Sequence, residues 1–241
     1  MRHFLDWASK NETSVLQGQD TEALWFSILA NASNMPIPAL ACDGTNCRAD
    51  VNAEEILFNA HGFLTFADAS IGLGASWDLL AHGLYNATRG DASIFSSRFD
   101  TPGAVNFLSI GCLDWTHSAN SLSDILASQA MVETYAPLTK GATSQWLLQH
   151  ACLNWPIEVK NPPKKLDVRT NTTALLISST SDPSTGLPWA LGMLDEIENA
   201  VLVLRHGDGH TSFVLGGDAA GILEEYFITG KAPKEGIITR S

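Results

Sequence analysis

Basic residues are scarce in this sequence. Its 241 residues, 25.9 kDa in mass, contain 14 Lys and Arg against 26 Asp and Glu, which gives a formal net charge of −12 and a pI near 4.8. No basic block is present that could neutralise a phosphate backbone, so we expect no nucleic acid as a partner. The hydrophobic share of 45% and the charged share of 17% are typical of a globular chain and exclude a disordered one.

Long apolar runs are also absent. The longest aliphatic stretches, 174–177 and 200–204, are far shorter than the ~18 residues that a membrane span requires. We therefore expect no membrane as a partner. Residues 1–10 mix charged with apolar side chains and lack the continuous apolar stretch of a secretory signal, so export cannot be inferred from this end of the chain.

Cysteine is limited to four residues, and their spacing contains no Cys-x-x-Cys pattern of a zinc or dithiol site. If these residues are oxidised, three pairings are open to Cys42, Cys47, Cys112 and Cys152. The composition predicts about two Asn-x-Ser/Thr sequons by chance, and the sequence has four. They begin at Asn11, Asn31, Asn86 and Asn171. This small excess points to the secretory pathway.

The chain divides into two regions near 161–165, where the run Asn-Pro-Pro-Lys-Lys interrupts regular structure. Residues 1–160 show mainly the spacing of amphipathic helices, with Ser76 placed to cap one that begins at Trp77. Residues 166–241 alternate between short aliphatic runs and helical patterns. We expect strands at 173–179 and 200–204, and helices at 188–198 and 218–227. This alternation predicts one βαβ unit followed by a helix.

Two chemically useful residues follow the expected strands. A crossover of this length makes the strands parallel, so Asp182 and His210 should leave the sheet at the same edge. A carboxylate that accepts the ring N–H of a histidine fixes its tautomer, which is the acid and base half of a catalytic triad. The plainer alternative is that Asp182 starts a turn before Pro183 and His210 caps the next helix.

Three stretches in this region resemble a known family. They are Ala174-Leu-Leu-Ile-Ser-Ser-Thr-Ser-Asp182-Pro183, Arg205-His-Gly-Asp-Gly-His210-Thr-Ser-Phe, and Tyr226-Phe-Ile-Thr-Gly230-Lys-Ala-Pro233-Lys-Glu-Gly236. Together they are similar to the C-terminal region of the tripeptidyl-aminopeptidase-like serine hydrolases, α/β-hydrolase enzymes related to prolyl aminopeptidases. With decreasing clarity the resemblance extends back to about residue 20. It implies a partial α/β-hydrolase fold: a helical cap and post-cap region at 1–160, then the last parallel strands and helices at 166–241.

The resemblance assigns Asp182 as the triad acid and His210 as the triad base, and it implies no metal or organic cofactor. Such enzymes release short peptides or single residues from free N-termini. Their nucleophile lies on a Gly-x-Ser-x-Gly elbow before the cap, and that motif is absent from this sequence. Ser76 in Gly-Ala-Ser-Trp-Asp lacks the last glycine, so a helix cap is the better interpretation. We expect the nucleophile-bearing half, and with it the rest of the sheet, to be missing, and the chain to be inactive alone.

Several alternatives remain open at this point. His206, Asp208 and His210 could ligate a metal, and Cys112 after a strand-like run at 105–110 could be a thiol nucleophile. A non-catalytic binding protein derived from the hydrolase is also possible. If the parent protein is secreted, Cys112 is more simply explained by a disulfide with Cys152, beside a short loop closed by Cys42 and Cys47.

The expected substrate is a peptide or a small ester or amide. The resemblance implies that the cap recognises its N-terminal ammonium. The candidates for this role, chosen by charge alone, are Glu54, Glu55 and Glu133.

Overall fold

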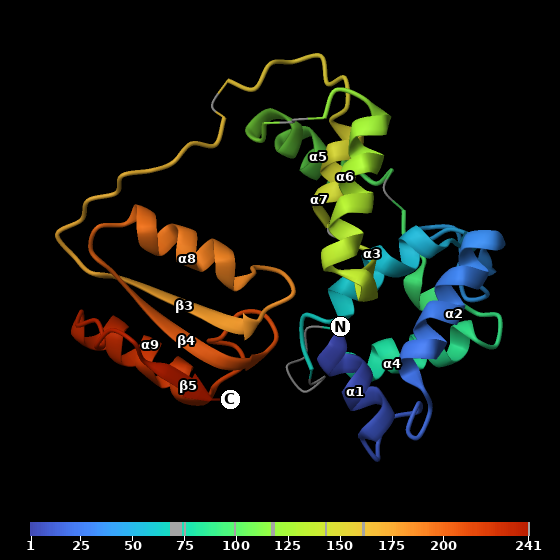
Figure 1. Ribbon diagram of the computed structural model, residues 1–241, viewed down its shortest axis with the longest axis horizontal. Coiled ribbons are helices and arrows are strands. Elements are labelled where there is room, and N and C mark those ends of the chain that lie inside the picture. Colours follow the sequence, from blue (N-terminus) through green and yellow to red (C-terminus); the bar gives the residue numbers. More distant parts are fainter. Residues whose placement is uncertain are drawn as a thin grey trace. The chain divides into compact units, whose positions relative to one another are not determined.

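The computed structural model describes residues 1–67, 74, 76–98, 100–116, 119–142, 144–160 and 162–240 (Figure 1). The chain folds into two compact units, one made of 1–62 and 78–163, the other of 63–77 and 164–241. In this division residues 63–77 fall in the second unit, whereas the boundary expected at 160–166 leaves them with the first region. One long-range contact of this segment is a hydrogen bond from the backbone N–H of His210 to the carbonyl of Thr65 at 2.9 Å.

The first unit is mainly helical. It contains the helices α1 to α7, except for the last residue of α3 and the first residue of α4. It also contains a two-stranded antiparallel sheet formed by β1 (Ile37–Pro38) and β2 (Asp50–Val51). The helices are α1 (Arg2–Lys10), α2 (Thr21–Asn34), α3 (Ala53–Phe63), α4 (Trp77–Ala87), α5 (Pro102–Asp114), α6 (Leu122–Tyr135) and α7 (Ser144–Ala151). Among the described residues, none of the helices combines the length with the hydropathy that a membrane span requires.

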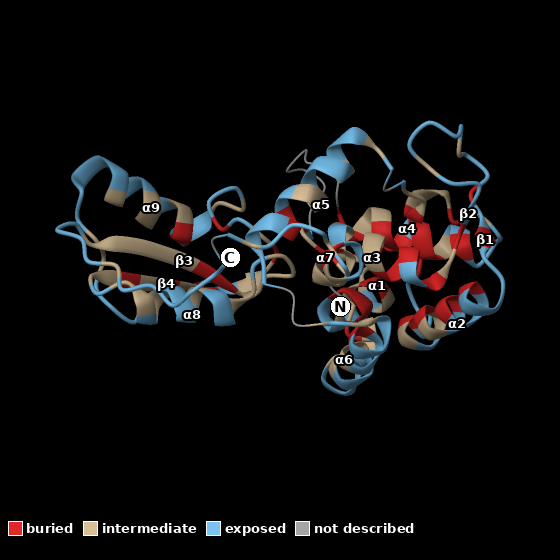
Figure 2. Ribbon diagram, turned by 90° about the horizontal axis from the view of Figure 1, so that it is seen from above, coloured by how far each residue is buried: buried red, intermediate tan, exposed pale blue. Residues whose placement is uncertain are grey.

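The core of this unit lies among α1 to α4, where buried residues concentrate (Figure 2). Trp25 and Ile56 are completely buried there, as are Phe4, Leu29, Leu80 and Leu84. The indole N–H of Trp25 also donates to the carbonyl of Leu138, so α2 is fixed to the turn that follows α6. Apolar burial at helical spacing therefore holds these helices together.

The run 105–110, expected to be strand-like, is helical and lies within α5. The helix begins directly after Thr101, whose hydroxyl accepts the N–H of Ala104, and Pro102 occupies the first turn. These start signals stand before the β-branched and aliphatic run. They override its strand propensity, which is a weak determinant by itself.

The second unit is an α/β layer structure. Its parallel sheet has the order β3-β4-β5, formed by β3 (Ala174–Ser181), β4 (Ala200–Asp208) and β5 (Ile238–Arg240). The helices α8 (Leu187–Glu196) and α9 (Gly217–Thr229) lie on opposite faces of the sheet (Figures 1 and 2). The expected βαβ unit is present, but the third strand was missed because three residues carry too little pattern to recognise.

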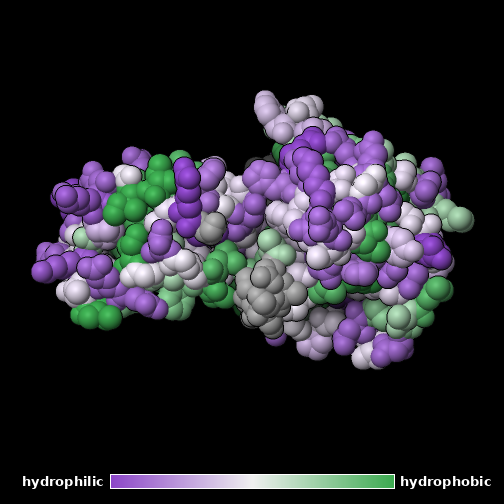
Figure 3. Space-filling view, turned by 90° about the horizontal axis from the view of Figure 1, so that it is seen from below, coloured by the Kyte–Doolittle hydropathy of each residue, from purple (hydrophilic) through white to green (hydrophobic). Residues whose placement is uncertain are grey.

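Apolar surface remains exposed on this small layer structure. Figure 3 shows green apolar patches on the second unit. Its exposed large side chains include Leu166, Trp189, Met193, Phe227, Ile228 and Ile238. Parallel sheets normally have more strands and bury both faces. The second unit is therefore a partial α/β fold.

Candidate functional site: an aspartate and a histidine at the sheet edge

The strands β3 and β4 run parallel and end at the same edge of the sheet (Figure 1). Near this edge the register shifts, because Ser179 pairs with Arg205 whereas Ser181 pairs with Asp208. The extra residue in β4 forms a bulge, stabilised by a hydrogen bond from the Ser179 hydroxyl to the Gly207 carbonyl at 2.6 Å. Bulges redirect the side chains that follow them. Asp182 and His210 follow this bulge on the two strands.

The structure brings Asp182 and His210 into direct contact. Nδ1 of His210 lies 3.0 Å from Oδ2 and 3.2 Å from Oδ1 of the carboxylate. The Asp182 side chain is only 6% exposed, whereas that of His210 is 28% exposed. The carboxylate is therefore shielded from water while the imidazole remains accessible.

Further donors hold the Asp182 carboxylate in its charged form. Oδ1 accepts the backbone N–H groups of Ser184 and Thr185 at 2.7 and 2.9 Å, and Oδ2 accepts the Thr185 hydroxyl at 2.9 Å. Burial raises the pKa of Asp182, but the hydrogen bonds from Thr185, His210 and Ser184 outweigh it, so the pKa lies below its usual value. An ionised acid thus faces the ring at neutral pH.

This contact determines the chemistry of the imidazole. Since a carboxylate can only accept, Nδ1 carries the proton in the neutral ring. Nε2 then presents its lone pair, and it has no hydrogen-bond partner among the described residues. Such an atom can take a proton from a hydroxyl and return it to a leaving group.

The loop that carries His210 has unusual backbone geometry. Gly209 has a φ of +93°, and a Cβ at this position would lie 3.0 Å from the Thr65 carbonyl oxygen. The N–H of Gly209 donates to the carbonyl of Ser181, while that of His210 donates to Thr65. Only glycine satisfies both the left-handed conformation and the close approach without strain.

A buried arginine holds the same loop through hydrogen bonds to its backbone carbonyls. Arg205 is 1% exposed, and Nη2 donates to the carbonyls of Asp208 and Gly209, each at 2.8 Å. Its Nε donates to the Ser212 hydroxyl at 3.2 Å. Burial lowers the pKa of the guanidinium, and the nearby carboxylates of Asp182 and Asp208 partly offset this effect.

Arg205 was not among the predicted site residues, although the alternation of buried residues along β4 marks it. Val201 and Val203 are buried on alternate positions of β4, and Arg205 is the next residue on that face. Alternation with period two therefore placed a charged residue on the buried side of the strand. A buried charge has to be paired or hydrogen-bonded, which marks Arg205 as an organising residue.

The plainer interpretation of the two residues is partly correct. Asp182 does form a turn with Ser184 and Thr185, in addition to its contact with the histidine. His210 does not cap a helix, because α9 begins at Gly217 after Gly216 in the N-cap position.

Three other candidates lose their support. Ser76 directly precedes α4 and is completely buried, so it cannot act as an exposed nucleophile. The thiol hypothesis for Cys112 is wrong, because this residue is buried and disulfide-bonded to Cys152. The metal hypothesis also fails, since no three His, Cys, Asp or Glu side chains in the described ranges group as metal ligands, and Nδ1 of His210 faces Asp182 instead.

Both disulfides of the simplest scheme are present. Cys42 pairs with Cys47 across five residues, and Cys112 pairs with Cys152 across forty. All four cysteines are described, and none is free. Both bonds lie in the first unit.

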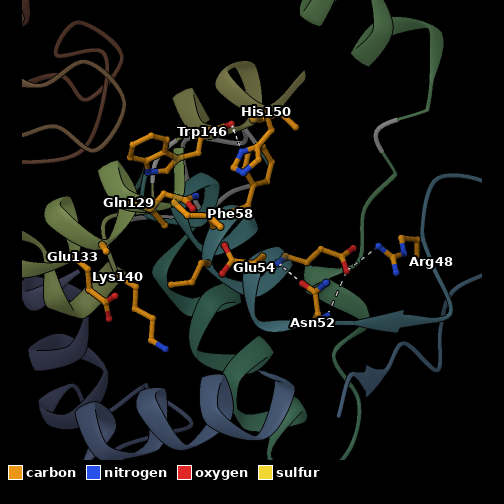
Figure 4. Close-up of a pocket in the computed structure, with 15 residues that line it drawn as sticks. Arg48, Asn52, Glu54, Phe58, Gln129, Glu133, Lys140, Trp146 and His150 are labelled. Atoms are coloured by element: carbon orange, nitrogen blue, oxygen red, sulfur yellow. Dashed lines mark hydrogen bonds and ion pairs between the residues drawn. The ribbon is translucent and has the colours of Figure 1, made fainter. Parts of the chain in front are cut away.

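All three glutamates selected by charge line one cavity of about 690 Å³ in the first unit (Figure 4). Glu54 and Glu133 are exposed. Glu55 is 6% exposed and lies 3.5 Å from the Arg48 guanidinium. Lys140 and His150 add basic groups to the wall, and the apolar part comes from Leu57, Phe58, Leu126, Trp146 and Leu147.

A parallel sheet with an acid and a histidine after successive strands, in that chain order, is the arrangement found in the last part of an α/β-hydrolase fold. Residues 136–238 match the family model described as TAP-like protein, so this part of the chain is similar to that α/β-hydrolase family. The matched segment contains Asp182 and His210. No curated protein matches the chain.

Proposed function

We propose that this chain supplies the acid and the base of a Ser-Asp-His hydrolase that releases short peptides or single residues from peptide N-termini. The observation that carries the proposal is the 3.0 Å contact between His210 Nδ1 and the shielded Asp182 carboxylate. His210 takes the proton of a seryl hydroxyl as the hydroxyl attacks the peptide carbonyl, then returns it to the leaving amine. Asp182 holds the tautomer and stabilises the imidazolium.

The orientation of the ring is tested directly by 15N NMR of the histidine side chains. The neutral His210 ring should be protonated on Nδ1, and Asp182→Asn should shift the proton towards Nε2, because an amide no longer demands a donor from the ring. His82 on the surface of α4 is the internal control and should not change. A wild-type His210 protonated mainly on Nε2 would contradict the proposed role.

The nucleophile of this reaction is proposed to lie outside the 241 residues, because the elbow motif is absent from them. A fluorophosphonate probe should therefore leave the purified chain unlabelled. Labelling that disappears on substitution of one serine would overturn this point. Reading the coding frame upstream of Met1 is a second test, in which an in-frame Gly-x-Ser-x-Gly supports the proposal.

If such a frame exists, the complete enzyme provides the activity test. His210→Ala should lower kcat by roughly a thousandfold or more while KM changes little, because the residue acts on the proton in the transition state. An unchanged kcat would exclude His210 as the base.

The acidic cavity supports the substrate class within this proposal. Glu54 and Glu133 offer carboxylates to an N-terminal ammonium, and Lys140 in the same wall can pair with a peptide carboxylate. Calorimetric titration with a tripeptide should give binding that is lost on N-acetylation and weakened by Glu133→Gln. Glu158→Gln, on an exposed residue outside the cavity, is the matched control and should bind as the wild type does.

The same cavity favours one second candidate, a binding protein without catalysis. In that case the chain binds the tripeptide, its coding frame has no upstream elbow, and Asp182→Asn leaves every measured property except local stability unchanged. The upstream frame decides between the two candidates.

A further inference from the structure

The sequon at Asn171 is not used by the proposed hydrolase chemistry, and the structure presents it as a modification site. The residue lies in the segment before β3, outside the helices and strands. Its side chain is exposed and makes no hydrogen bond within the described part of the chain. The amide nitrogen that a transferase must reach is therefore open to solvent.

The other three sequons are presented differently. Asn31 lies within α2, and the hydroxyl of its Ser33 donates to the Leu29 carbonyl at 2.9 Å. Asn86 lies in the last turn of α4. Asn11 is only half exposed, and its Oδ1 accepts both the N–H and the hydroxyl of Thr13. Among the four sequon asparagines, Asn171 alone is both exposed and outside helices and strands.

The chemistry of the cysteines supports the compartment in which such a modification occurs. Both disulfides are formed and no described cysteine is free. Disulfides persist in oxidising compartments such as the ER lumen, where sequons are modified.

We propose that Asn171 carries an N-linked glycan. The step transfers an oligosaccharide from a polyprenyl diphosphate donor: Nδ2 of Asn171 forms a bond to the sugar C1, the C1–O bond to the diphosphate breaks, and the lipid diphosphate leaves. The amide nitrogen gives one proton to a base of the transferase. This inference rests on the secretory location that the excess of sequons indicates, and it is independent of the proposed hydrolase activity.

The position of Asn171 makes the glycan compatible with the Asp182–His210 pair. Asn171 precedes the first residue of β3, whereas Asp182 follows the last. Eight strand residues separate the two by roughly 25 Å along β3, at about 3.3 Å per residue. The glycan therefore extends from the edge of the sheet opposite to the candidate site.

The test is to express the full chain behind a cleavable signal peptide in a eukaryotic secretory host. Treatment with peptide N-glycosidase in heavy-oxygen water should convert Asn171 to labelled Asp in the tryptic peptide that runs from Thr170 to Arg205. Asn171→Gln and Thr173→Ala should each remove one glycan mass, and Thr173→Ser should keep it. An unlabelled Asn171 in the secreted wild-type chain overturns the proposal.

The matched variant Asp182→Asn separates this test from that of the proposed function. It should be glycosylated as the wild type is, because the modification does not use the pair. Since peptide mapping of the wild-type protein reads occupancy directly, the result does not depend on whether any variant folds.

Discussion

Arg205 occupies the third buried position of β4, after the aliphatic residues Val201 and Val203. Taking a guanidinium out of water is costly unless its donors are satisfied. Here they are directed at the carbonyls of Asp208 and Gly209 and at the Ser212 hydroxyl. These hydrogen bonds offset the cost of burying the charge, and they also hold the loop that carries His210 in one position.

Arg205→Met should loosen this loop. The side chain volume remains, but two carbonyls lose their donors, and the expected loss of stability is roughly 2–4 kcal/mol. Hydrogen exchange of the His210 amide, which donates to Thr65, should become much faster. Arg169→Met removes an exposed arginine whose ion-pair partners are the exposed carboxylates of Asp167 and Glu198, and should cost less than about 0.5 kcal/mol. Equal effects of the two variants would contradict the assignment.

The charge of Asp182 makes a pH-dependent contribution to stability. Its pKa is lowered in the folded chain, so the stabilisation is complete above the unfolded value of about 3.9 and is lost as pH falls through the folded pKa. The difference in unfolding free energy between the wild type and Asp182→Asn should therefore shrink as pH falls below about 4. Urea melts over this acid range measure it. A difference that grows as pH falls below about 4 would mean that the carboxylate is not stabilised in its charged form.

At the scale of elements, the loop after β4 depends on one glycine whose backbone no other residue adopts easily. Gly209→Ala adds both the strain of a φ of +93° and a contact of 3.0 Å with the Thr65 oxygen. Gly216→Ala adds strain alone, since φ is +74° there and no atom lies within 4 Å. We expect a loss of about 1 kcal/mol for Gly216→Ala and clearly more for Gly209→Ala. Chemical denaturation compares the two, and equal losses would show that the Thr65 contact is unimportant.

The elements that could be predicted from the sequence are those with a clear hydrophobic period or with turn-forming residues at their ends. β3, α8, β4 and α9 lie where aliphatic runs and four-residue spacing placed them, and parallel pairing followed from the length of the crossover. The meeting of Asp182 with His210 needed only that topology. Their fine geometry was not predictable, because it depends on the bulge and on Thr65, a residue distant in sequence.

For residues 105–110 the sequence pattern predicted the wrong element, because these residues lie in the helix α5. Its residues favour a strand locally, but Thr101 and Pro102 start a helix, and Gly111 with Cys112 then packs that helix against α7. Tertiary packing and the disulfide to Cys152 decide the outcome there, and neither is encoded in a six-residue window.

At the scale of the whole molecule, the two units are stabilised by different means. The first has a large apolar core and both disulfides, whereas the second has a three-stranded sheet with exposed apolar side chains. Within the first unit the two bonds close loops of very different length. In the chain-entropy description a crosslink stabilises more when its loop is longer.

The two disulfides should therefore contribute different amounts to the free energy of unfolding. Replacing Cys112 and Cys152 by serine should cost about 4 kcal/mol, and replacing Cys42 and Cys47 about 2 kcal/mol, because the separations are forty and five residues. Thermal and urea unfolding of the two double variants, followed by hydrogen exchange in α5 and α7, measures the difference. The Cys112–Cys152 variant should also lose protection in those helices, since Leu108, Leu148 and Trp155 pack around that bond. If the short loop proves the more costly to open, the native packing around Cys42 and Cys47, and not loop entropy, determines the stability of this unit.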